Sequence, residues 1–406
     1  MMLADRLFES PAPEVAVPAQ RGPTVFIHGF LGWGERDDIY AAVPYWGLAS
    51  CDVLAWLRTL GYDCHAASLG ALSSAWDRAC ELYAQLTGGR TDYGVGHSKE
   101  YNHSRWGTDY GNPLFEGWGD DKRIDIVAHS FGGATARLFL DILANGRPRE
   151  LEAAKAAGVK PSPFFEGGRC SWVRSISALA APHNGTTLVN CSPDLTGSMV
   201  RLFTAAAKAL GISDFKGLYD FQLDQFGFFR SPGESLPDAL ARMMGADFLE
   251  SGDHALSDLS VDSSMALNKT LTLFPGKYYF SYPACRTHFS LLSYDQLPDA
   301  GMTPLLMRFC AAMGRWCASE TPGGVSIGRD WLPNDGLVNT LSAMYPKGDA
   351  FCVHGGGDTA FKAGIWNVMP VRRLDHLAVI GGVFNAGAAD TKSFYLDIMK
   401  NIDSTY

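Results

Sequence analysis

The sequence predicts an α/β fold, in which a mostly parallel central sheet carries helices on both faces. Apolar, β-branched runs typical of buried strands alternate with segments whose apolar residues recur at helical spacing. The chain has 406 residues, of which 47% are hydrophobic, and no linker-like stretch divides it. We therefore expect one large domain spanning residues 1–406, with insertions between its strands and helices.

Each expected element follows from its local sequence. Residues 1–21 are a Pro- and Ala-rich lead-in that we expect to be loosely held. Strands are predicted at 24–27, 63–67, 124–129, 173–179 and 278–282, and a helix closed by Gly61 is predicted at 52–60. A second helix is expected after 124–129, because Leu138, Phe139, Ile142 and Leu143 are three or four residues apart and Asn145-Gly146 provides a C-terminal cap signal.

Two stretches break the alternation and are predicted insertions. Residues 73–120 are rich in Trp, Tyr, Gly, His and Asp and show weak periodicity, which favours an ordered insertion. Residues 191–262 form the second insertion, in which one helical face is lined by Met199, Leu202, Phe203, Ala206 and Leu210. That amphipathic helix suits a lid, and an ordinary packed helix is the alternative.

The strongest functional signal lies at the end of the strand predicted at 124–129. The chain there reads Ile-Val-Ala-His-Ser-Phe-Gly-Gly, so Ser130 stands between Ala128 and Gly132. A serine on a sharp strand-to-helix turn brings two backbones together and leaves room only for small residues at these flanking positions. This pattern is the nucleophile elbow of the α/β-hydrolase fold and makes Ser130 the candidate nucleophile. The alternative is that Ser130 only caps the helix.

A serine nucleophile in this fold is followed along the chain by an acid and then by a histidine base. Among the histidines after Ser130, only His376 stands in a polar turn near the C-terminus, where the loop after the last strand should present the base. Asp335 is the expected acid, because it lies in the turn Pro-Asn-Asp-Gly-Leu. Asp375 is the competitor, although adjacent side chains seldom point at one another usefully.

The hydrolysis of an ester by such a triad also needs donors for an oxyanion. One should be the backbone N–H of Phe131, directly after the nucleophile, and the other that of Phe30, in the loop after the strand at 24–27. Gly29 lets this loop approach the elbow. His28 is expected to be a structural hydrogen-bonding residue.

Five motifs are spread over the chain: His28-Gly-Phe-Leu-Gly-Trp-Gly34, Leu72-Ser-Ser-Ala-Trp-Asp-Arg-Ala-Cys-Glu81, Ala128-His-Ser130, Pro182-His-Asn-Gly-Thr-Thr-Leu-Val-Asn190 and Asn334-Asp-Gly336. Together they resemble the zinc-containing bacterial lipases of the Geobacillus and Staphylococcus type, from about residue 22 to the end. The resemblance implies a triacylglycerol lipase or carboxylesterase with a Ser130, Asp335 and His376 triad, a helical lid and a zinc-bound extra subdomain.

The zinc ligands implied by this resemblance are Asp77, His97, His103 and Asp253. Two imidazole nitrogens and two carboxylates suit a tetrahedral Zn²⁺ ion. Because four protein ligands fill the shell, the zinc should be structural and should tie the two insertions together. The same family carries calcium ligands after the catalytic histidine, but Ala378 and Val383 stand at those positions, so calcium is predicted absent there. Phe131 also differs from the Gln found in many relatives.

The charge of the chain and its lack of recognisable targeting signals limit the expected binding partners and location of the protein. The net charge is −9 and Lys and Arg do not cluster, so neither nucleic acid nor an anionic bilayer is expected to bind. No segment reaches the roughly 18 apolar residues of a membrane span, and the start lacks the apolar stretch of a secretory signal. The chain is therefore predicted to be cytoplasmic, with secretion, usual for the resembling family, as the alternative. Nine cysteines without CxxC pairs favour reduced thiols, although a disulfide or two stays open.

These inferences predict a monomeric serine hydrolase that cleaves carboxylic esters of hydrophobic acids through an acyl-enzyme. A short-chain carboxylesterase or a polyester hydrolase is the alternative within this class. A metallohydrolase would need an open position on the zinc, which four ligands argue against. A hydrolase fold used only for binding is a third possibility, against which the intact triad argues.

Overall fold

The computed structural model describes residues 17–192, 226, 250–355, 357, 360–382 and 387–406. Residues 1–16, the predicted lid helix around Met199–Leu210 and Val383 lie outside this part of the chain.

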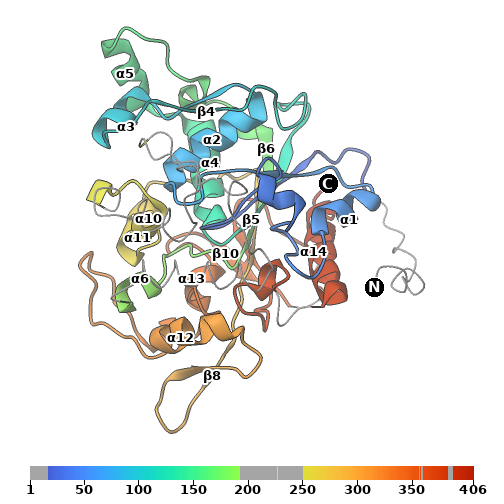
Figure 1. Cartoon of the computed structure of the whole chain (residues 1–406), viewed down its shortest axis with the longest axis vertical. Coiled ribbons are helices and arrows are strands. Elements are labelled where there is room, and N and C mark those ends of the chain that lie inside the picture. The colour runs from blue at the N-terminus through green and yellow to red at the C-terminus, as the bar shows by residue number, and fades with distance from the viewer. Residues whose placement is uncertain (1–16, 193–225, 227–249, 356, 358–359, 383–386) are drawn as a thin grey trace.

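A seven-stranded parallel sheet forms the centre of the molecule (Figure 1). Its strands are β1 (Thr24–Ile27), β2 (Cys64–Ala67), β5 (Ile124–His129), β6 (Val173–Leu179), β7 (Tyr278–Tyr282), β10 (Phe351–Val353) and β11 (Trp366–Val368). Their order in the sheet is β10-β11-β7-β6-β5-β1-β2, and every neighbouring pair is parallel. The order reverses between β1 and β5, and at such a switch point the loops at the carboxyl ends of the strands leave a crevice for ligands.

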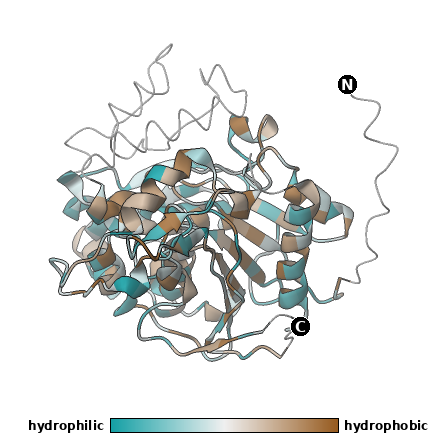
Figure 2. Ribbon diagram, turned by 90° about the horizontal axis from the view of Figure 1, so that it is seen from below, coloured by the Kyte–Doolittle hydropathy of each residue, from teal (hydrophilic) through white to brown (hydrophobic). Residues whose placement is uncertain are grey.

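Helices cover both faces of this sheet, because successive strand residues point to opposite sides. Phe26 packs into a core cluster with α1 (Val53–Thr59) and α14 (Ala388–Asp403). Its neighbours Val25 and Ile27 pack into a second cluster with α2 (Ala75–Thr87) and α4 (Gly132–Asn145). Figure 2 shows apolar residues concentrated on the central strands between these two layers. The predicted α/β architecture is therefore confirmed.

The other described elements surround this core. The helices are α3 (Val95–Glu100), α5 (Pro148–Ala156), α6 (Leu188–Cys191), α10 (Ala255–Asp258), α11 (Val261–Asn268), α12 (Pro304–Met313) and α13 (Thr340–Met344). Short 3-10 helices are η2 (Asp38–Ala41), η3 (Pro163–Glu166), η4 (Cys170–Trp172), η6 (Arg329–Trp331) and η7 (Ala378–Ile380). Two antiparallel pairs, β3 (Arg90–Asp92) with β4 (Trp106–Asp109) and β8 (Thr287–Phe289) with β9 (Gln296–Pro298), form small separate sheets.

The segment 73–120 is more regular than its sequence predicts. It begins with α2, a 13-residue helix that packs against α4 on one face of the main sheet. The apolar residues of α2 recur at helical spacing, and the polar side chains of Asp77, Arg78, Glu81 and Gln85 are buried beside them. The remaining elements of the segment, β3, α3 and β4, lie beyond α2 at the upper end of the molecule in Figure 1.

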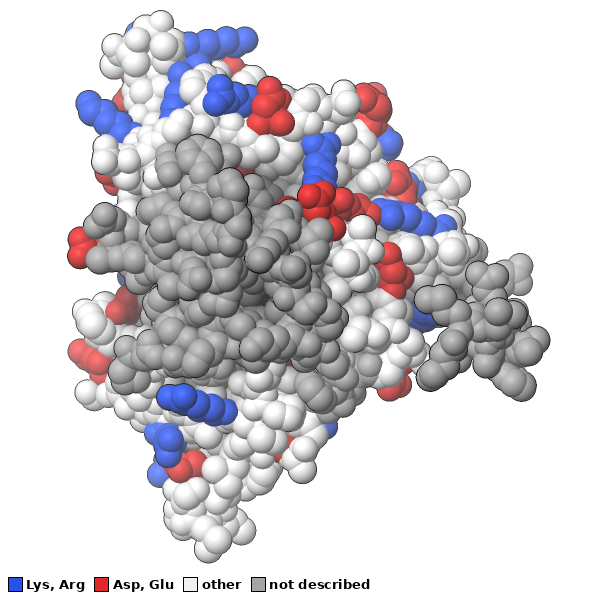
Figure 3. All heavy atoms as spheres, in the orientation of Figure 1, with Lys and Arg blue, Asp and Glu red and all other residues white. Residues whose placement is uncertain are grey.

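Three further properties concern the thiols, the helices and the surface charge of the described residues. All nine cysteines are free thiols. Among the described helices, none combines the length and the apolarity that crossing a bilayer requires. On the face seen in Figure 3, acidic and basic side chains are interspersed without a large patch of one sign.

Candidate functional site

Ser130 stands in a tight turn between β5 and α4. Its φ is +55°, a left-handed conformation that is uncommon for a residue other than glycine. The turn is possible because its neighbours are small: a Cβ at Gly132 would lie 2.5 Å from the carbonyl oxygen of Ile27, and one at Gly29 would lie 2.7 Å from the Cβ of Ser130. The residues around Ser130 thus have the backbone geometry of a nucleophile elbow.

The structure brings Ser130, His376 and Asp335 together from three distant segments. The Ser130 Oγ and His376 Nε2 atoms are 2.8 Å apart, and the His376 Nδ1 and Asp335 Oδ2 atoms are also 2.8 Å apart. All three residues are buried, with Ser130 the most exposed at 8%. Because Nδ1–H can donate to the carboxylate, Nε2 keeps a lone pair for the serine hydroxyl.

Hydrogen bonds fix the carboxylate of Asp335 in this orientation. Its Oδ1 atom accepts bonds from the backbone N–H groups of Leu337 (3.0 Å) and Val338 (2.8 Å), which leaves Oδ2 for His376. The backbone N–H of His376 also donates to the carbonyl oxygen of Asp335 at 2.9 Å. Asn334 holds the turn by accepting from Gly336, whose φ of +103° requires a glycine.

Asp375, the competing acid, has different hydrogen-bond partners. Its Oδ2 atom accepts from the backbone N–H and the hydroxyl of Thr303, at 2.7 and 2.8 Å, and its Oδ1 atom accepts from Leu377 and Ala378. These bonds tie the turn that carries His376 to the start of α12. Asp335 therefore contacts the imidazole of His376 directly, whereas Asp375 stabilises the turn that carries His376.

A buried pair behind the triad was not predicted from the sequence. The ring of His129 lies 4.7 Å from that of His376, and its Nδ1 atom is 2.8 Å from the hydroxyl of Tyr45. That hydroxyl also accepts a bond from the backbone N–H of Gly29. Burial lowers the pKa of His129 well below its usual value, so this ring adds no positive charge beside His376. His129 stands next to Ser130 in the sequence, but nothing in the sequence points to Tyr45.

The predicted oxyanion donors lie in the two loops that meet at Ser130. Within the described residues, the backbone N–H groups of Phe30 and Phe131 donate to no acceptor and so remain available. The first loop is held from behind by the buried guanidinium of Arg78, which donates to the carbonyl oxygens of His28 and Gly70. His28 itself bonds only backbone groups, because its Nε2 accepts from Leu69 and its Nδ1 faces the carbonyl oxygen of Gly29.

An apolar cluster adjoins the triad. Phe30, Leu337 and Leu377 pack against the buried side chains of Leu188, Met302, Leu306, Phe309, Cys310 and Met313. Four of the six buried residues belong to α12, and Thr303 at the start of this helix is bonded to Asp375. An apolar chain attached to a carbonyl group at Ser130 would find apolar surface on this side.

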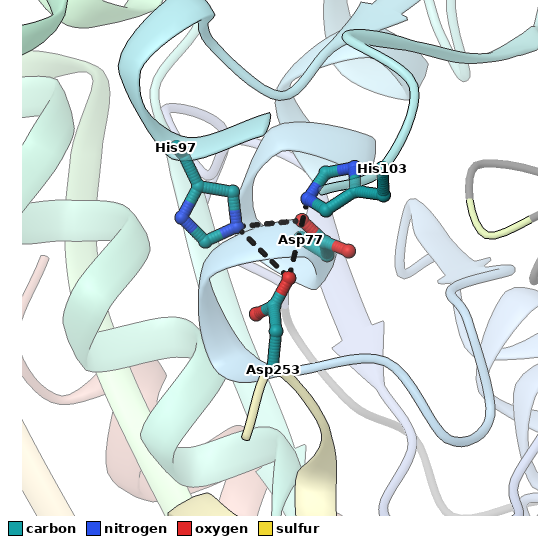
Figure 4. A group of neighbouring side chains, drawn as sticks. All are labelled: Asp77, His97, His103 and Asp253. Atoms are coloured by element: carbon teal, nitrogen blue, oxygen red, sulfur yellow. Dashed lines mark hydrogen bonds and ion pairs between the residues drawn. The ribbon is translucent and has the colours of Figure 1, made fainter. Parts of the chain in front are cut away.

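The four predicted metal ligands also form one cluster (Figure 4). Asp77 comes from α2, His97 from α3, His103 from the loop after α3, and Asp253 from the segment before α10. His97 Nε2 lies 3.3 Å from Asp77 Oδ1 and 3.1 Å from Asp253 Oδ2, and His103 Nε2 lies 3.2 Å from Asp253 Oδ2. The donor atoms of all four lie within 4.8 Å of one another.

These distances test whether a metal ion fits. For bonds of about 2.0–2.1 Å to a tetrahedral Zn²⁺, two ligand atoms are separated by about 3.3 Å, close to the three nitrogen-to-oxygen distances here. His103 Nδ1 lies 2.8 Å from the carbonyl oxygen of Ser104, which orients Nε2 toward the cluster. The ring of Trp76 stacks on His97 at 4.9 Å. The cluster can therefore bind a metal ion.

The electrostatics of the cluster also favour a cation. Burial, and after it the nearby Asp253, raise the pKa of Asp77. Burial lowers the pKa of His97, but its bonds to Asp253 and Asp77 outweigh burial and raise it to about 10. The hydrogen bonds of Asp253 to His103 and His97 likewise overcome burial and lower its pKa. Two buried carboxylates thus need positive charge beside them, which protons or a metal ion can supply.

Comparisons with known proteins find relatives that match most of the chain. A family model described as the lipase-like C-terminal domain matches residues 20–403. Lipase 2 of Staphylococcus aureus is 34% identical over 390 residues, which are 95% of this chain and 54% of that protein. The chain thus spans about half the length of the curated relatives that it matches.

Two solved structures are also similar over nearly the whole chain. EstA from Clostridium botulinum has a TM-score of 0.85 at 30% identity, covering 97% of this chain and 89% of its own. Staphylococcus hyicus lipase has a TM-score of 0.79 at 30% identity, covering 96% of this chain and 98% of its own.

Proposed function

The chain belongs to the staphylococcal-type lipase family, and from this premise we propose that it hydrolyses carboxylic esters of hydrophobic acids, triacylglycerols among them, with Ser130 as nucleophile. The single observation that carries the proposal is the chain of two 2.8 Å contacts from Ser130 through His376 to Asp335. A short-chain carboxylesterase or a polyester hydrolase stays the alternative within the same chemistry.

Acylation begins with the transfer of the Ser130 hydroxyl proton to His376 Nε2 while Oγ attacks the ester carbonyl carbon. The carbonyl oxygen becomes an oxyanion, which accepts hydrogen bonds from the backbone N–H groups of Phe30 and Phe131. His376 is then an imidazolium ion. The carboxylate of Asp335 stabilises that charge through its bond to Nδ1–H, and it holds the ring in the orientation that this transfer needs.

Collapse of the tetrahedral intermediate breaks the ester bond. His376 gives its Nε2 proton to the leaving alkoxide oxygen, so that the alcohol departs and the acyl group stays on Ser130. In deacylation, His376 takes a proton from water, the hydroxide attacks the acyl carbon, and the proton returns to Oγ. The product is a carboxylic acid and the serine is restored.

The acyl group is proposed to lie against the apolar cluster formed by Phe30, Leu337, Leu377 and the buried face of α12. This position puts hydrophobic acids on the side of the site where burial of each methylene group gains roughly 0.8 kcal/mol. We propose that residues 1–406 form a single hydrolase domain and that the predicted lid within 191–262 governs access to this surface. Secretion and a cytoplasmic location both stay predictions.

Zinc is the proposed occupant of the Asp77, His97, His103 and Asp253 cluster. When bound, it would supply positive charge to the two carboxylates. Its coordination bonds would link α2, the segment around α3 and the segment before α10. Four protein donors favour a structural ion, so none of the catalytic steps above uses it. No calcium site is proposed beside His376, where Ala378 offers no ligand side chain.

The proposed function is tested by rates on p-nitrophenyl esters from acetate to palmitate, measured for the wild type and for Ser130→Ala. We expect the wild type to hydrolyse the series and the variant to lose at least about 10⁴-fold of the rate while keeping its circular dichroism spectrum. A folded wild type that hydrolyses none of the esters would refute the proposal. The dependence on chain length distinguishes a lipase from a short-chain esterase.

A further inference from the structure

The β8–β9 hairpin carries a concentration of exposed apolar side chains. Five of the eleven large exposed hydrophobic residues in the described part of the chain belong to it: Phe289, Leu291, Leu292, Tyr294 and Leu297. Leu291 and Leu292 are the most exposed, at 80% and 97%. Single exposed apolar residues are ordinary, but a contiguous group on one element marks a surface that another apolar phase covers.

The hairpin is an ordered element that holds these side chains outward. Thr287 pairs with Pro298 and Phe289 with Gln296 in an antiparallel register. The loop is closed by backbone bonds from Ser290 N to the carbonyl oxygen of Asp295 and from Tyr294 N to that of Ser290, both 2.9 Å. The rings of Phe289 and Tyr294 meet edge to face at 6.0 Å, and the guanidinium of Arg329 lies 5.6 Å from the Tyr294 ring.

The base of the hairpin is joined to the candidate active site. It leaves the sheet after β7, at the carboxyl edge where Ser130 follows β5. The backbone N–H of Arg286 donates to the carbonyl oxygen of Asn334 at 2.9 Å, and that of Asn334 donates to the hydroxyl of Thr287 at 3.4 Å. Asn334 precedes Asp335, so the hairpin begins at the turn that carries the candidate acid.

The tip has the chemistry of an insertion into lipid. Residues 289–294 read Phe-Ser-Leu-Leu-Ser-Tyr and contain no charged side chain. Two leucines stand at the end of the loop with an aromatic residue on each side, and aromatic rings favour the boundary between an apolar phase and water. In Figure 3 the lowest lobe of the molecule, below the β8 label of Figure 1, shows neither sign of charge, and charged side chains appear only above it.

Size and charge decide between the possible occupants. A stable contact with a second copy would need about 20–30 residues on each side, whereas the whole hairpin offers five exposed apolar side chains. An anionic surface is disfavoured by the net charge of −9 and by the absence of Lys and Arg from residues 289–294. A neutral apolar phase requires neither a broad face nor opposite charge.

We infer that the tip of the β8–β9 hairpin inserts Leu291 and Leu292 into the surface of a neutral lipid phase and so holds the enzyme on aggregated substrate. The inference rests on the proposed function, because such an anchor serves an enzyme whose ester substrate gathers apart from water. Its contribution is to binding at the surface, and the chemistry at Ser130 does not depend on it.

The test compares the wild type with the double variant Leu291→Ser/Leu292→Ser. Binding is measured by co-sedimentation with sucrose-loaded phosphatidylcholine vesicles, and activity is measured on emulsified tributyrin and on dissolved p-nitrophenyl butyrate. The matched control is Val159→Ser, which removes an exposed apolar side chain just after α5, at the opposite end of the molecule in Figure 1. Both sites are exposed, so all three proteins should fold alike.

We expect the partition coefficient of the double variant onto vesicles to be roughly 10- to 100-fold lower than that of the wild type. The reason is that the two leucine side chains that would be buried in lipid have been replaced by serines. The rate of the double variant on emulsion below saturation should fall similarly, while kcat/KM on the dissolved ester stays within about twofold and Val159→Ser behaves as wild type. Equal vesicle binding by the wild type and the double variant would overturn the inference. A wild type that does not bind the vesicles would also overturn it. A wild-type dimer that the double variant dissociates, detected by sedimentation velocity, would also overturn it in favour of a second copy. Vesicle binding through the tip without any ester hydrolysis would instead refute the proposed function alone.

Discussion

Replacing Asp335 with Asn perturbs one atom of the proposed triad and leaves the shape of the side chain unchanged. The Oδ1 atom of Asp335 accepts two backbone N–H bonds, from Leu337 and Val338. The introduced amide must keep its oxygen in that position, so its NH₂ group faces His376 Nδ1. An NH₂ group can only donate, which forces Nδ1 to accept and moves the ring proton to Nε2. His376 then has no lone pair for the hydroxyl proton of Ser130.

The size of the effect follows from this change of tautomer. In serine hydrolases with this triad, the same substitution lowers kcat by about 10⁴-fold, which is about 5 kcal/mol of transition-state stabilisation. The free energy of unfolding should change little, since Asp335→Asn keeps the two backbone bonds and the volume of the buried side chain. The melting temperature is therefore expected to stay within a few degrees of the wild type.

Asp375→Asn provides the matched control. In that variant the amide cannot accept both bonds from Thr303 and both from Leu377 and Ala378, so it should lower stability by about 1–3 kcal/mol and cost at most about tenfold in kcat. The assay is kcat/KM on p-nitrophenyl butyrate together with the melting temperature of each protein. A larger loss of activity in Asp375→Asn than in Asp335→Asn would show that the acid has been assigned to the wrong residue.

Two further predictions concern the oxyanion hole and the metal. Gly29→Ala should lower kcat on p-nitrophenyl butyrate by about 10²- to 10³-fold, because the added Cβ would lie 2.7 Å from that of Ser130 and would displace the Phe30 amide; unchanged kcat would show that this loop supplies no donor. Metal analysis should give one zinc per chain, and a chelator should lower the melting temperature of the wild type by about 5 °C or more but not that of His97→Ala. Immediate loss of turnover on chelation, in protein that is still folded, would indicate a catalytic ion instead.

Buried stretches rich in β-branched and aromatic residues made the central strands predictable. The bounds of β1, β5, β6 and β7 agree with the predicted ranges, because apolar residues such as those of Ile124–His129 are buried on both faces, although polar residues such as Asp125 interrupt them. The three-residue strands β10 and β11 are too short for a periodic pattern, and β11 has the polar Asn367 at its centre. The place of β11 comes from pairing with β7 and that of β10 from pairing with β11, and a single sequence does not encode such pairing locally.

Helix α2 and the β8–β9 hairpin show two other reasons for missing an element. The apolar residues of α2 recur at helical spacing, but the helix fills only the first part of the stretch 73–120, whose weak overall periodicity concealed it. The hairpin has an apolar tip instead of the usual Gly or Asn turn, and Tyr294 adopts the positive φ of +59° that those residues favour. Local rules therefore gave no turn signal.

The candidate site residues also differ in whether the local sequence indicates them or only tertiary packing brings them together. The place of Ser130 in a strand-to-helix turn was predictable because the strand, the turn and the helix are contiguous in the sequence. His376 and Asp335 followed from the chain order of the fold. The donors at Asp77, His97, His103 and Asp253 meet only through tertiary packing, so they were found through resemblance to a family and not through spacing. Tyr45 behind His129 had no signal of either kind.

The most direct test of the central claim is covalent labelling by a p-nitrophenyl alkylphosphonate, followed by peptide mass spectrometry. The account predicts one label per chain, on the peptide that contains Ser130, with loss of ester hydrolysis in proportion to labelling and no label on folded Ser130→Ala. Labelling at another serine, or full activity in protein that is labelled at Ser130, would contradict the claim that Ser130 is the nucleophile.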